Sequence, residues 1–133
     1  MSIGGSCLCG KVKLTIRSFE RDVVACHCTQ CRKQTGHFVA ATRVHNSDLT
    51  ISGEEHLKWY KASADATRGF CQHCGSVLLW RSEDSDRTSI LAGCLDSPTG
   101  LTVSHHIYAA DKGDYYEIDD GKPVFEKLSL IHI

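Results

Sequence analysis

Short runs of alternating polar and apolar residues are the main pattern in this chain. Residues 11–17 alternate with a period of two, which is typical of a strand that is buried on one face. Further short runs are rich in β-branched and aromatic residues and are bounded by Gly, Asn, Ser or Asp. They are residues 38–44, 50–52, 58–61, 77–81, 89–91 and 106–108. The pattern predicts many short strands and a mostly β fold.

The sequence has few stretches in which apolar residues recur every three or four positions, the pattern of a helix. We expect one or two helical turns over residues 29–35, because Gly36 can adopt the left-handed conformation that commonly ends a helix. The charged run 81–87 is typical of a solvated hairpin loop. The chain has 133 residues, no internal repeat and no Pro- or Ser-rich linker, so its length predicts a single domain over residues 1–133.

Charge and hydropathy exclude some classes of partner. The 15 Lys and Arg residues are balanced by 16 Asp and Glu, so no basic excess is available to bind a nucleic-acid backbone. No apolar run approaches the roughly 18 residues that a membrane span needs. Residues 1–6 carry neither a basic stretch nor an apolar segment, which predicts a cytoplasmic protein. The sequence leaves the oligomeric state open, including a homo-oligomer.

Cysteine is the unusual component, with 8 residues in 133. Disulfides require an oxidising compartment, whereas dense cysteines in a reducing cytosol are typical of thiolates that bind metal. Because we expect a cytoplasmic protein, we favour metal over disulfides.

The outer cysteines form two short pairs. They are Cys7, Cys9, Cys71 and Cys74. Within each pair the sulfurs can converge on one ion from a tight turn, and Gly10 and Gly75 directly follow the pairs and supply flexible backbone. Four thiolates complete the tetrahedral shell of a zinc ion. The spacing therefore predicts a structural zinc site that stabilises the fold by an amount comparable to the net stability of a small domain.

The middle set has three cysteines within six residues: Cys26, Cys28 and Cys31. Three ligands leave one position of a tetrahedral zinc ion open, as in catalytic zinc sites. Three thiolates also give the site a net charge of −1 with Zn²⁺, which weakens activation of water and favours the exchange of a soft ligand. A substrate thiol in the open position would become a reactive thiolate. The set therefore predicts a site that makes or breaks carbon–sulfur bonds.

Other interpretations of the cysteines stay open. Cys94 could complete the middle set to a second closed site, or it could be a buried small side chain. The pairs at 28–31 and 71–74 could be redox dithiols, although no βαβ pattern surrounds them. A protein with a single bound metal is a further alternative.

Four segments together resemble a known family. They are residues 5–12, 26–36, 68–76 and 92–96, and together they contain all eight cysteines. In order and spacing these motifs are similar to those of the glutathione-dependent formaldehyde-activating enzymes, also called the centromere-protein-V/Gfa domain. The resemblance implies a small β-tent fold with sandwich-like antiparallel sheets, little helix and two zinc ions.

The same resemblance implies an activity. Cys7, Cys9, Cys71 and Cys74 match the structural ligands of the family, and Cys26, Cys28 and Cys31 match the catalytic ones. In this family glutathione sulfur enters the catalytic shell and adds to formaldehyde, giving S-hydroxymethylglutathione, and the enzymes are carbon–sulfur lyases. The alternative is a non-catalytic zinc module that binds a protein partner.

Polar neighbours of the middle set are candidates for substrate contacts. Arg32 and Lys33 directly follow the third cysteine and could meet the carboxylates of a peptide thiol. His27 separates two ligands, and alternation turns it away from the metal, where it is a candidate proton carrier. His37 is a comparable candidate. Alternation along the strand at 106–108 predicts that only one of His105 and His106 faces inward.

Overall fold

The structure is a computed structural model that describes residues 2–128. Its chain divides into two compact units, one of residues 1–21 and 42–100 and one of residues 22–41 and 101–133. The described residues form ten strands and a single α-helix, so the predicted mostly β class is confirmed. The prediction of one domain over the whole chain stays a prediction.

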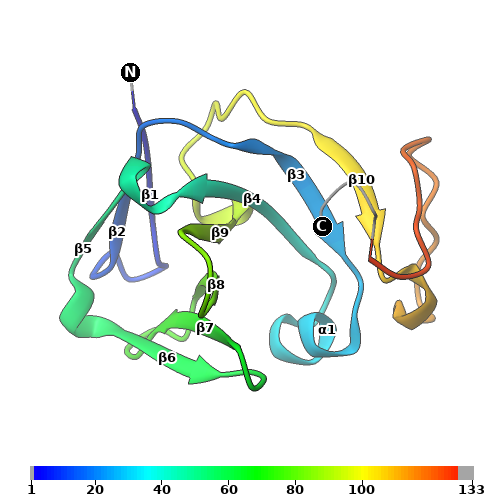
Figure 1. The fold of residues 1–133 in the computed structure, drawn as a ribbon, viewed down its shortest axis with the longest axis horizontal. Helices are drawn as coiled ribbons and strands as arrows, with labels where there is room; N and C mark the ends of the chain where they lie inside the picture. Colours follow the sequence, from blue (N-terminus) through cyan, green and yellow to red (C-terminus); the bar gives the residue numbers. More distant parts are fainter. Residues whose placement is uncertain (1, 129–133) are drawn as a thin grey trace. The chain divides into compact units, whose positions relative to one another are not determined.

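Antiparallel strands make up the first unit (Figure 1). A three-stranded sheet has the order β1-β2-β5, and a further run has the order β9-β8-β7-β6. The bounds are β1 Ile3–Ser6, β2 Lys13–Ile16, β5 Leu49–Ser52, β6 Leu57–Lys61, β7 Ala66–Cys71, β8 Val77–Ser82 and β9 Arg87–Leu91. The short 3-10 helices η1 Asn46–Asp48, η2 Glu54–His56 and η3 Ala92–Cys94 lie between strands.

The alternating pattern explains how these strands form a core. In β2 the apolar Leu14 and Ile16 are buried, whereas the intervening polar positions are exposed. Leu78, Leu79 and Ile90 are fully buried on β8 and β9. Each such side chain stabilises the fold by roughly 1.5–3 kcal/mol relative to an exposed one.

The predicted hairpin loop lies between β8 and β9, which pair antiparallel. It is shorter than the charged run suggested, because both ends of that run belong to the strands. Arg81 donates a hydrogen bond to the hydroxyl of Thr88, and Arg87 forms an ion pair with Glu20 at 2.9 Å. The prediction was too long because a charged residue can also lie in a strand when it has a polar partner, as Arg81 and Arg87 do.

The second unit contains the helix and a parallel strand pair. Strand β3 (Arg21–Cys26) leads into α1 (Thr29–Thr35), and β10 (Val103–Ile107) pairs with β3 in parallel. Strand β4 (Val39–His45) follows α1, with residues 42–45 belonging to the first unit, and the 3-10 helix η4 (Ala109–Asp111) follows β10. We expected only antiparallel sheets, so this parallel pair is a difference from the prediction. A parallel pair requires a long connection between its strands, and β3 and β10 are far apart in the chain.

The ends of the helix agree with the sequence. The predicted range 29–35 is confirmed, and Gly36 caps the helix in the left-handed conformation with a φ of 88°. Its N–H donates to the carbonyl of Arg32. The strands β1, β3 and β7 were not expected, since glycines in β1 and β7 and the polar start of β3 obscure the alternation.

Both histidines of β10 are buried, so the prediction that only one faces inward is wrong. His105 and His106 are 6% and 5% exposed. The register of β10 against β3 shifts between Val103 and His105, which disturbs strict alternation. The C-terminal segment also covers the strand, because the N–H of Phe125 donates to the carbonyl of His106.

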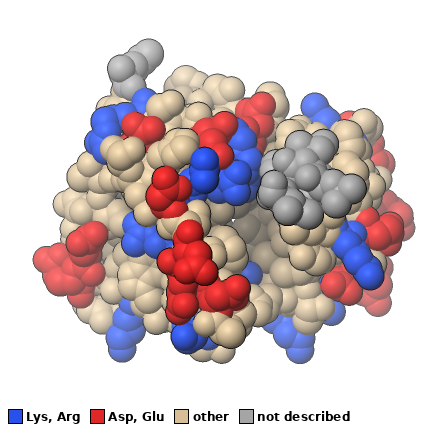
Figure 2. All heavy atoms as spheres, viewed as in Figure 1, with Lys and Arg blue, Asp and Glu red and all other residues tan. Residues whose placement is uncertain are grey.

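The surface carries both signs of charge. On the face drawn in Figure 2, acidic and basic side chains are interspersed, in keeping with a net charge of −1. Within residues 2–128, no helix is both long enough and apolar enough to cross a membrane.

Candidate metal centres

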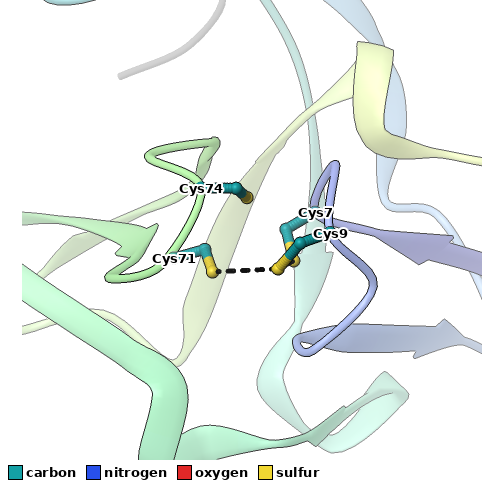
Figure 3. A group of neighbouring side chains, drawn as sticks. All are labelled: Cys7, Cys9, Cys71 and Cys74. Atoms are coloured by element: carbon teal, nitrogen blue, oxygen red, sulfur yellow. Dashed lines mark hydrogen bonds between the residues drawn. The ribbon is translucent and has the colours of Figure 1, made fainter.

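Four thiols converge in the first unit. Cys7 and Cys9 come from the turn after β1, whereas Cys71 ends β7 and Cys74 lies in the turn that follows it (Figure 3). All four sulfurs lie within 4.8 Å of one another. The structure thus brings together the four residues that we predicted as one site, from turns that are 62 residues apart in the chain.

The spacing of these sulfurs fits a tetrahedral metal ion. The Sγ atoms of Cys7 and Cys9 are 3.6 Å apart, and those of Cys9 and Cys71 are 3.7 Å apart. Sulfurs that are bound tetrahedrally at 2.3 Å from zinc are about 3.8 Å apart, whereas a disulfide would bring them to about 2 Å. All eight cysteines are free thiols. The cluster could therefore hold a metal ion, and the donor set fits zinc.

Backbone N–H groups orient two of the thiols. The N–H of Val12 donates to Cys7 Sγ at 3.3 Å, and the N–H of His73 donates to Cys71 Sγ at 3.4 Å. Gly10 and Gly75 close the two turns with positive φ values of 82° and 79°. A side chain other than glycine would be strained at both positions.

Ser76 links the two turns, a role that we did not assign from the sequence. Its hydroxyl accepts a hydrogen bond from the N–H of Leu8 at 2.9 Å and lies 3.2 Å from Cys74 Sγ, to which it can donate. Hydrogen bonds to the Cys74 thiol from the hydroxyl of Ser76, and then from the backbone N–H groups of Ser76 and Cys9, lower its pKa to about 5. No spacing rule marks a serine in this position, because its partner Leu8 is far away in the chain.

The four thiols resist simultaneous ionisation. The Lys11 N–H lowers the pKa of Cys9, but burial and the neighbouring thiols outweigh this effect and raise the pKa to about 11. A thiolate at Cys74 therefore coexists with a protonated Cys9 unless a cation joins them. A metal ion bound among the four thiols would stabilise their thiolate forms.

Three thiols converge in the second unit. Cys26 ends β3, Cys28 is the N-cap of α1, and Cys31 is buried in the first turn of the helix. Their sulfurs lie within 4.8 Å of one another. Cys28 Sγ accepts a hydrogen bond from the N–H of Cys31 at 3.3 Å, so the start of the helix orients one thiol. The structure again brings together the residues that we predicted as a set.

This second cluster also fits a cation. The thiols of Cys28 and Cys31, together with burial, raise the pKa of Cys26 far above its ordinary value of 9.0. The thiols would bind as thiolates only if a positive charge lay among them.

The predicted substrate contacts flank this cluster on α1. Arg32 Nε donates to the carbonyl of Asp111 at 3.1 Å, which holds the guanidinium in place. Lys33 is exposed. Their predicted contact with the carboxylates of a thiol stays a prediction.

His27 joins a chain of hydrogen-bonded side chains. Its Nδ1 lies 2.5 Å from the hydroxyl of Tyr116, and its Nε2 lies 2.9 Å from Nδ1 of His106. Nε2 of His106 lies 2.8 Å from a carboxylate oxygen of Asp120. Sequence reasoning singled out His27 but missed Tyr116 and Asp120, which lie in a C-terminal segment without periodicity.

The other candidates have different surroundings. Nδ1 of His37 lies 3.0 Å from the hydroxyl of Tyr115, which donates to the carbonyl of Gly36. Cys94 belongs to the first unit, where burial, Asp96 and Cys7 raise its pKa to about 12. A thiol with this pKa is inert at neutral pH unless it binds a metal.

A mostly β fold with one cluster of four thiols and another of three defines a class: small cysteine-rich β proteins that could hold metal ions in thiolate sites. The comparison of sequences is more specific. The profile of the glutathione-dependent formaldehyde-activating enzyme family matches residues 2–111, and the chain belongs to this family.

Individual relatives are distant. An uncharacterised lyase of Schizosaccharomyces pombe is 25% identical over 123 residues, which cover 91% of this chain and 88% of the relative. The crystal structure of a Rhodobacter sphaeroides protein matches with a TM-score of 0.59 and 21% identity. That match covers 92% of this chain and 98% of the other, and it shows that the fold is shared.

Proposed function

We propose that this protein is a zinc-dependent carbon–sulfur lyase that acts on the adduct of a thiol and a small aldehyde. The observation that carries the proposal is the cluster of three thiols at Cys26, Cys28 and Cys31, which supplies one ligand fewer than a tetrahedral zinc ion needs. Membership of the family favours glutathione as the thiol and formaldehyde as the aldehyde. We propose two zinc ions per chain in a single domain, the second held by Cys7, Cys9, Cys71 and Cys74.

The reaction that we propose needs no redox partner. In synthesis, the sulfur of the thiolate gives an electron pair to the carbonyl carbon, the π pair of the C=O bond moves to oxygen, and the oxygen takes a proton. Cleavage reverses each step, so sulfur leaves with the electron pair of the C–S bond. A zinc ion bound by the three cysteines would keep the thiol of the substrate ionised at neutral pH.

Side chains of α1 have a binding role in this proposal. Glutathione carries two carboxylates, and Arg32 and Lys33 place two cations directly after the last ligand of the cluster. The hydrogen bond from Arg32 to the carbonyl of Asp111 uses Nε, so the terminal nitrogens of the guanidinium are the groups we propose for a carboxylate.

The binding of thiol can be tested with cobalt in place of zinc. We expect glutathione to change the thiolate-to-cobalt absorption of one of two bound ions. S-methylglutathione is the matched ligand, since its sulfur cannot ionise, and it should leave the spectrum unchanged. The Cys94→Ala variant should respond as the wild type does.

Other results would contradict the proposal. An unchanged spectrum with glutathione and other small thiols would overturn it. A response that arises only in Cys94→Ala would mean that Cys94 occupies the fourth position and that the protein is a non-catalytic zinc module.

A further inference from the structure

A turn of the second unit, residues 112–116, is fastened to helix α1 by hydrogen bonds at two points. Just before the turn, the carbonyl of Asp111 accepts a hydrogen bond from Nε of Arg32 at 3.1 Å. Four residues further along the helix, the carbonyl of Gly36 accepts a hydrogen bond from the hydroxyl of Tyr115 at 3.2 Å. The turn therefore lies along the last turn of α1.

The residues of this turn also hold its shape. Nζ of Lys112 donates to the carbonyls of Gly113 and Tyr116 at 3.2 and 2.6 Å. The ring of Tyr115 lies so close to Gly113 that a Cβ atom at position 113 would overlap it. Gly113 is buried, whereas Tyr115 is 61% exposed. The turn thus needs glycine at position 113 to bring the hydroxyl of Tyr115 to the end of α1.

Arg32 belongs to the part of α1 that carries the three-thiol cluster. Its backbone N–H donates to the carbonyl of Cys28 at 3.0 Å, and Cys31 directly precedes it. Side chains on a helix lean toward its N-terminus over the preceding turn, and here that turn begins at Cys28. The segment that holds Arg32 follows β10, whose residue Ile107 is paired with Cys26. The side chain of Arg32 and the segment that fixes it are therefore both neighbours of the cluster.

The bond to Asp111 orients the guanidinium of Arg32 without using its terminal nitrogens. Within residues 2–128, these two nitrogens have neither a hydrogen bond nor an ion pair. The planar guanidinium presents their N–H groups in a fixed geometry that matches the oxygens of a carboxylate. A side chain that is already fixed also loses less conformational entropy when a ligand binds.

We propose that Tyr115 is a positioning residue that acts through the turn and Arg32 to make the three-thiol site prefer thiols that carry a carboxylate. This proposal rests on the proposed function for its substrate, and it names the feature of the thiol that is selected. Tyr115 lies beyond residues 2–111, where the family profile matches, so the assignment comes from the geometry of this chain.

Loss of the Tyr115 hydroxyl should affect only ligands that use Arg32. Without this hydroxyl, the turn loses one of its two hydrogen bonds to α1, so the carbonyl of Asp111 holds the guanidinium less firmly. A thiol with a carboxylate should then bind more weakly. A thiol without a carboxylate makes no use of the guanidinium, and its binding should stay the same.

The position of Arg32 can be measured without any substrate. In ¹H–¹⁵N NMR spectra of the full-length, zinc-loaded protein, the Nε–H of Arg32 should exchange slowly with water because it is bonded to Asp111. Tyr115→Phe should speed this exchange about fivefold. Tyr60→Phe makes the same change at a tyrosine of the first unit that is 60% exposed, and it should have no effect. Equal exchange rates in the two variants would overturn the proposal.

The preference for a carboxylate is tested with a matched pair of ligands. Glutathione and its diethyl ester have the same thiol and differ in the two carboxylates, and the thiolate-to-cobalt absorption of the cobalt-substituted protein reports the binding of each. We expect the wild type and Tyr60→Phe to bind glutathione about tenfold more tightly than the ester. Tyr115→Phe and Gly113→Ala should lower this ratio about threefold by weakening the binding of glutathione alone. Arg32→Gln should abolish the preference.

The remaining outcomes separate this proposal from the proposed function. If the wild type binds both ligands equally tightly, or if Tyr115→Phe keeps the full ratio, the positioning role fails and the proposed function stands. If Tyr115→Phe weakens the binding of both ligands alike, the turn supports the site in general and the positioning role is overturned. If the wild type binds neither ligand, the proposed function fails, and the role of Tyr115 fails with it. The cobalt spectra of the variants without ligand should equal that of the wild type, which shows that the variants fold.

Discussion

The two thiol clusters use the same ligand chemistry but differ in how far they reach along the chain. Cys9 and Cys71 are 62 residues apart, whereas the three thiols of the second cluster fall within six residues. Closing the longer loop costs the unfolded chain about 2 kcal/mol more entropy, so a metal that bridges it restricts the unfolded state more strongly. This difference suits the four-thiol cluster to the structural role that we propose for it, because a metal there would restrict the unfolded chain more than a metal at the three-thiol cluster.

The residues that hydrogen-bond to each cluster or to its neighbours also differ in how far away they lie in the chain. The four thiols are oriented by backbone N–H groups and by Ser76, all close to the turns that carry them. Beside the three-thiol cluster, His27 is held by side chains from distant parts of the second unit. Partners beyond the ligands commonly tune the affinity and reactivity of a metal site.

The largest expected effect is loss of the fold on disruption of the four-thiol cluster. Cys71→Ser removes a buried thiol from the zinc site that we propose, and a structural zinc site contributes on the order of 10 kcal/mol, as much as the whole stability of a small domain. We expect the variant to show no cooperative unfolding by circular dichroism. A variant that unfolds cooperatively near the wild-type temperature would show that this cluster is not the main stabilising element.

The next largest effect separates the clusters. Cys28→Ser should fold, with a melting temperature close to that of the wild type, but should lose one of two zinc ions and the cobalt response to glutathione. Metal analysis and thermal unfolding of the same samples check both results. Cys94→Ser is the matched control and should keep both ions. If Cys28→Ser did not fold, the three-thiol cluster would be needed for the fold as much as the four-thiol cluster.

A smaller effect is expected from Ser76→Ala. The substitution removes the hydroxyl that accepts from Leu8 and lowers the pKa of Cys74, so that pKa should rise from about 5 toward its ordinary 9.0. We expect zinc affinity at the four-thiol cluster to fall 10- to 100-fold in competition with a chelator. The three-thiol cluster should be unaffected, and an equal loss at both clusters would contradict a local role for Ser76.

The smallest effect concerns an ion-pair network in the first unit that involves no thiol. Glu20 bonds Arg43 and Arg87 at 2.9 Å each, and although burial raises the pKa of Glu20, these cations lower it below the ordinary 4.5. Because the folded pKa is depressed, the contribution to stability is complete above pH 4.5 and is lost as the pH falls through the lowered pKa. Glu20→Gln should therefore cost about 1 kcal/mol at pH 7.

Urea unfolding of wild type and Glu20→Gln at matched pH values checks this effect. The difference between them should stay constant from pH 7 to about 4.5 and shrink at lower pH. Zinc content at pH 7 should be the same in both, and a change in zinc content would show that the network acts on the thiol clusters.

Features that depend on residues close together in the chain were predicted well from the sequence. The spacing of the cysteines identified two short pairs and a set of three, because cysteines that are two or three residues apart in the chain lie close together. The helix was placed correctly, since Gly36 can take the positive φ that ends it. Strands with clean alternation, such as β2, were found, whereas β1 and β7 were hidden by glycines that interrupt the pattern.

The amino-acid sequence by itself determined a mostly β protein with two groups of thiols suited to metal. Only the tertiary structure decided which side chains lie beside those groups. Ser76 accepts a hydrogen bond from Leu8 at the four-thiol cluster. Beside the three-thiol cluster, His27 is hydrogen-bonded to Tyr116 and to His106, which in turn contacts Asp120. The physical reason is that a turn or a ligand pair is encoded by neighbours in the chain. A hydrogen bond between residues 79 or 89 positions apart depends instead on how strands and loops pack, and no local pattern records it.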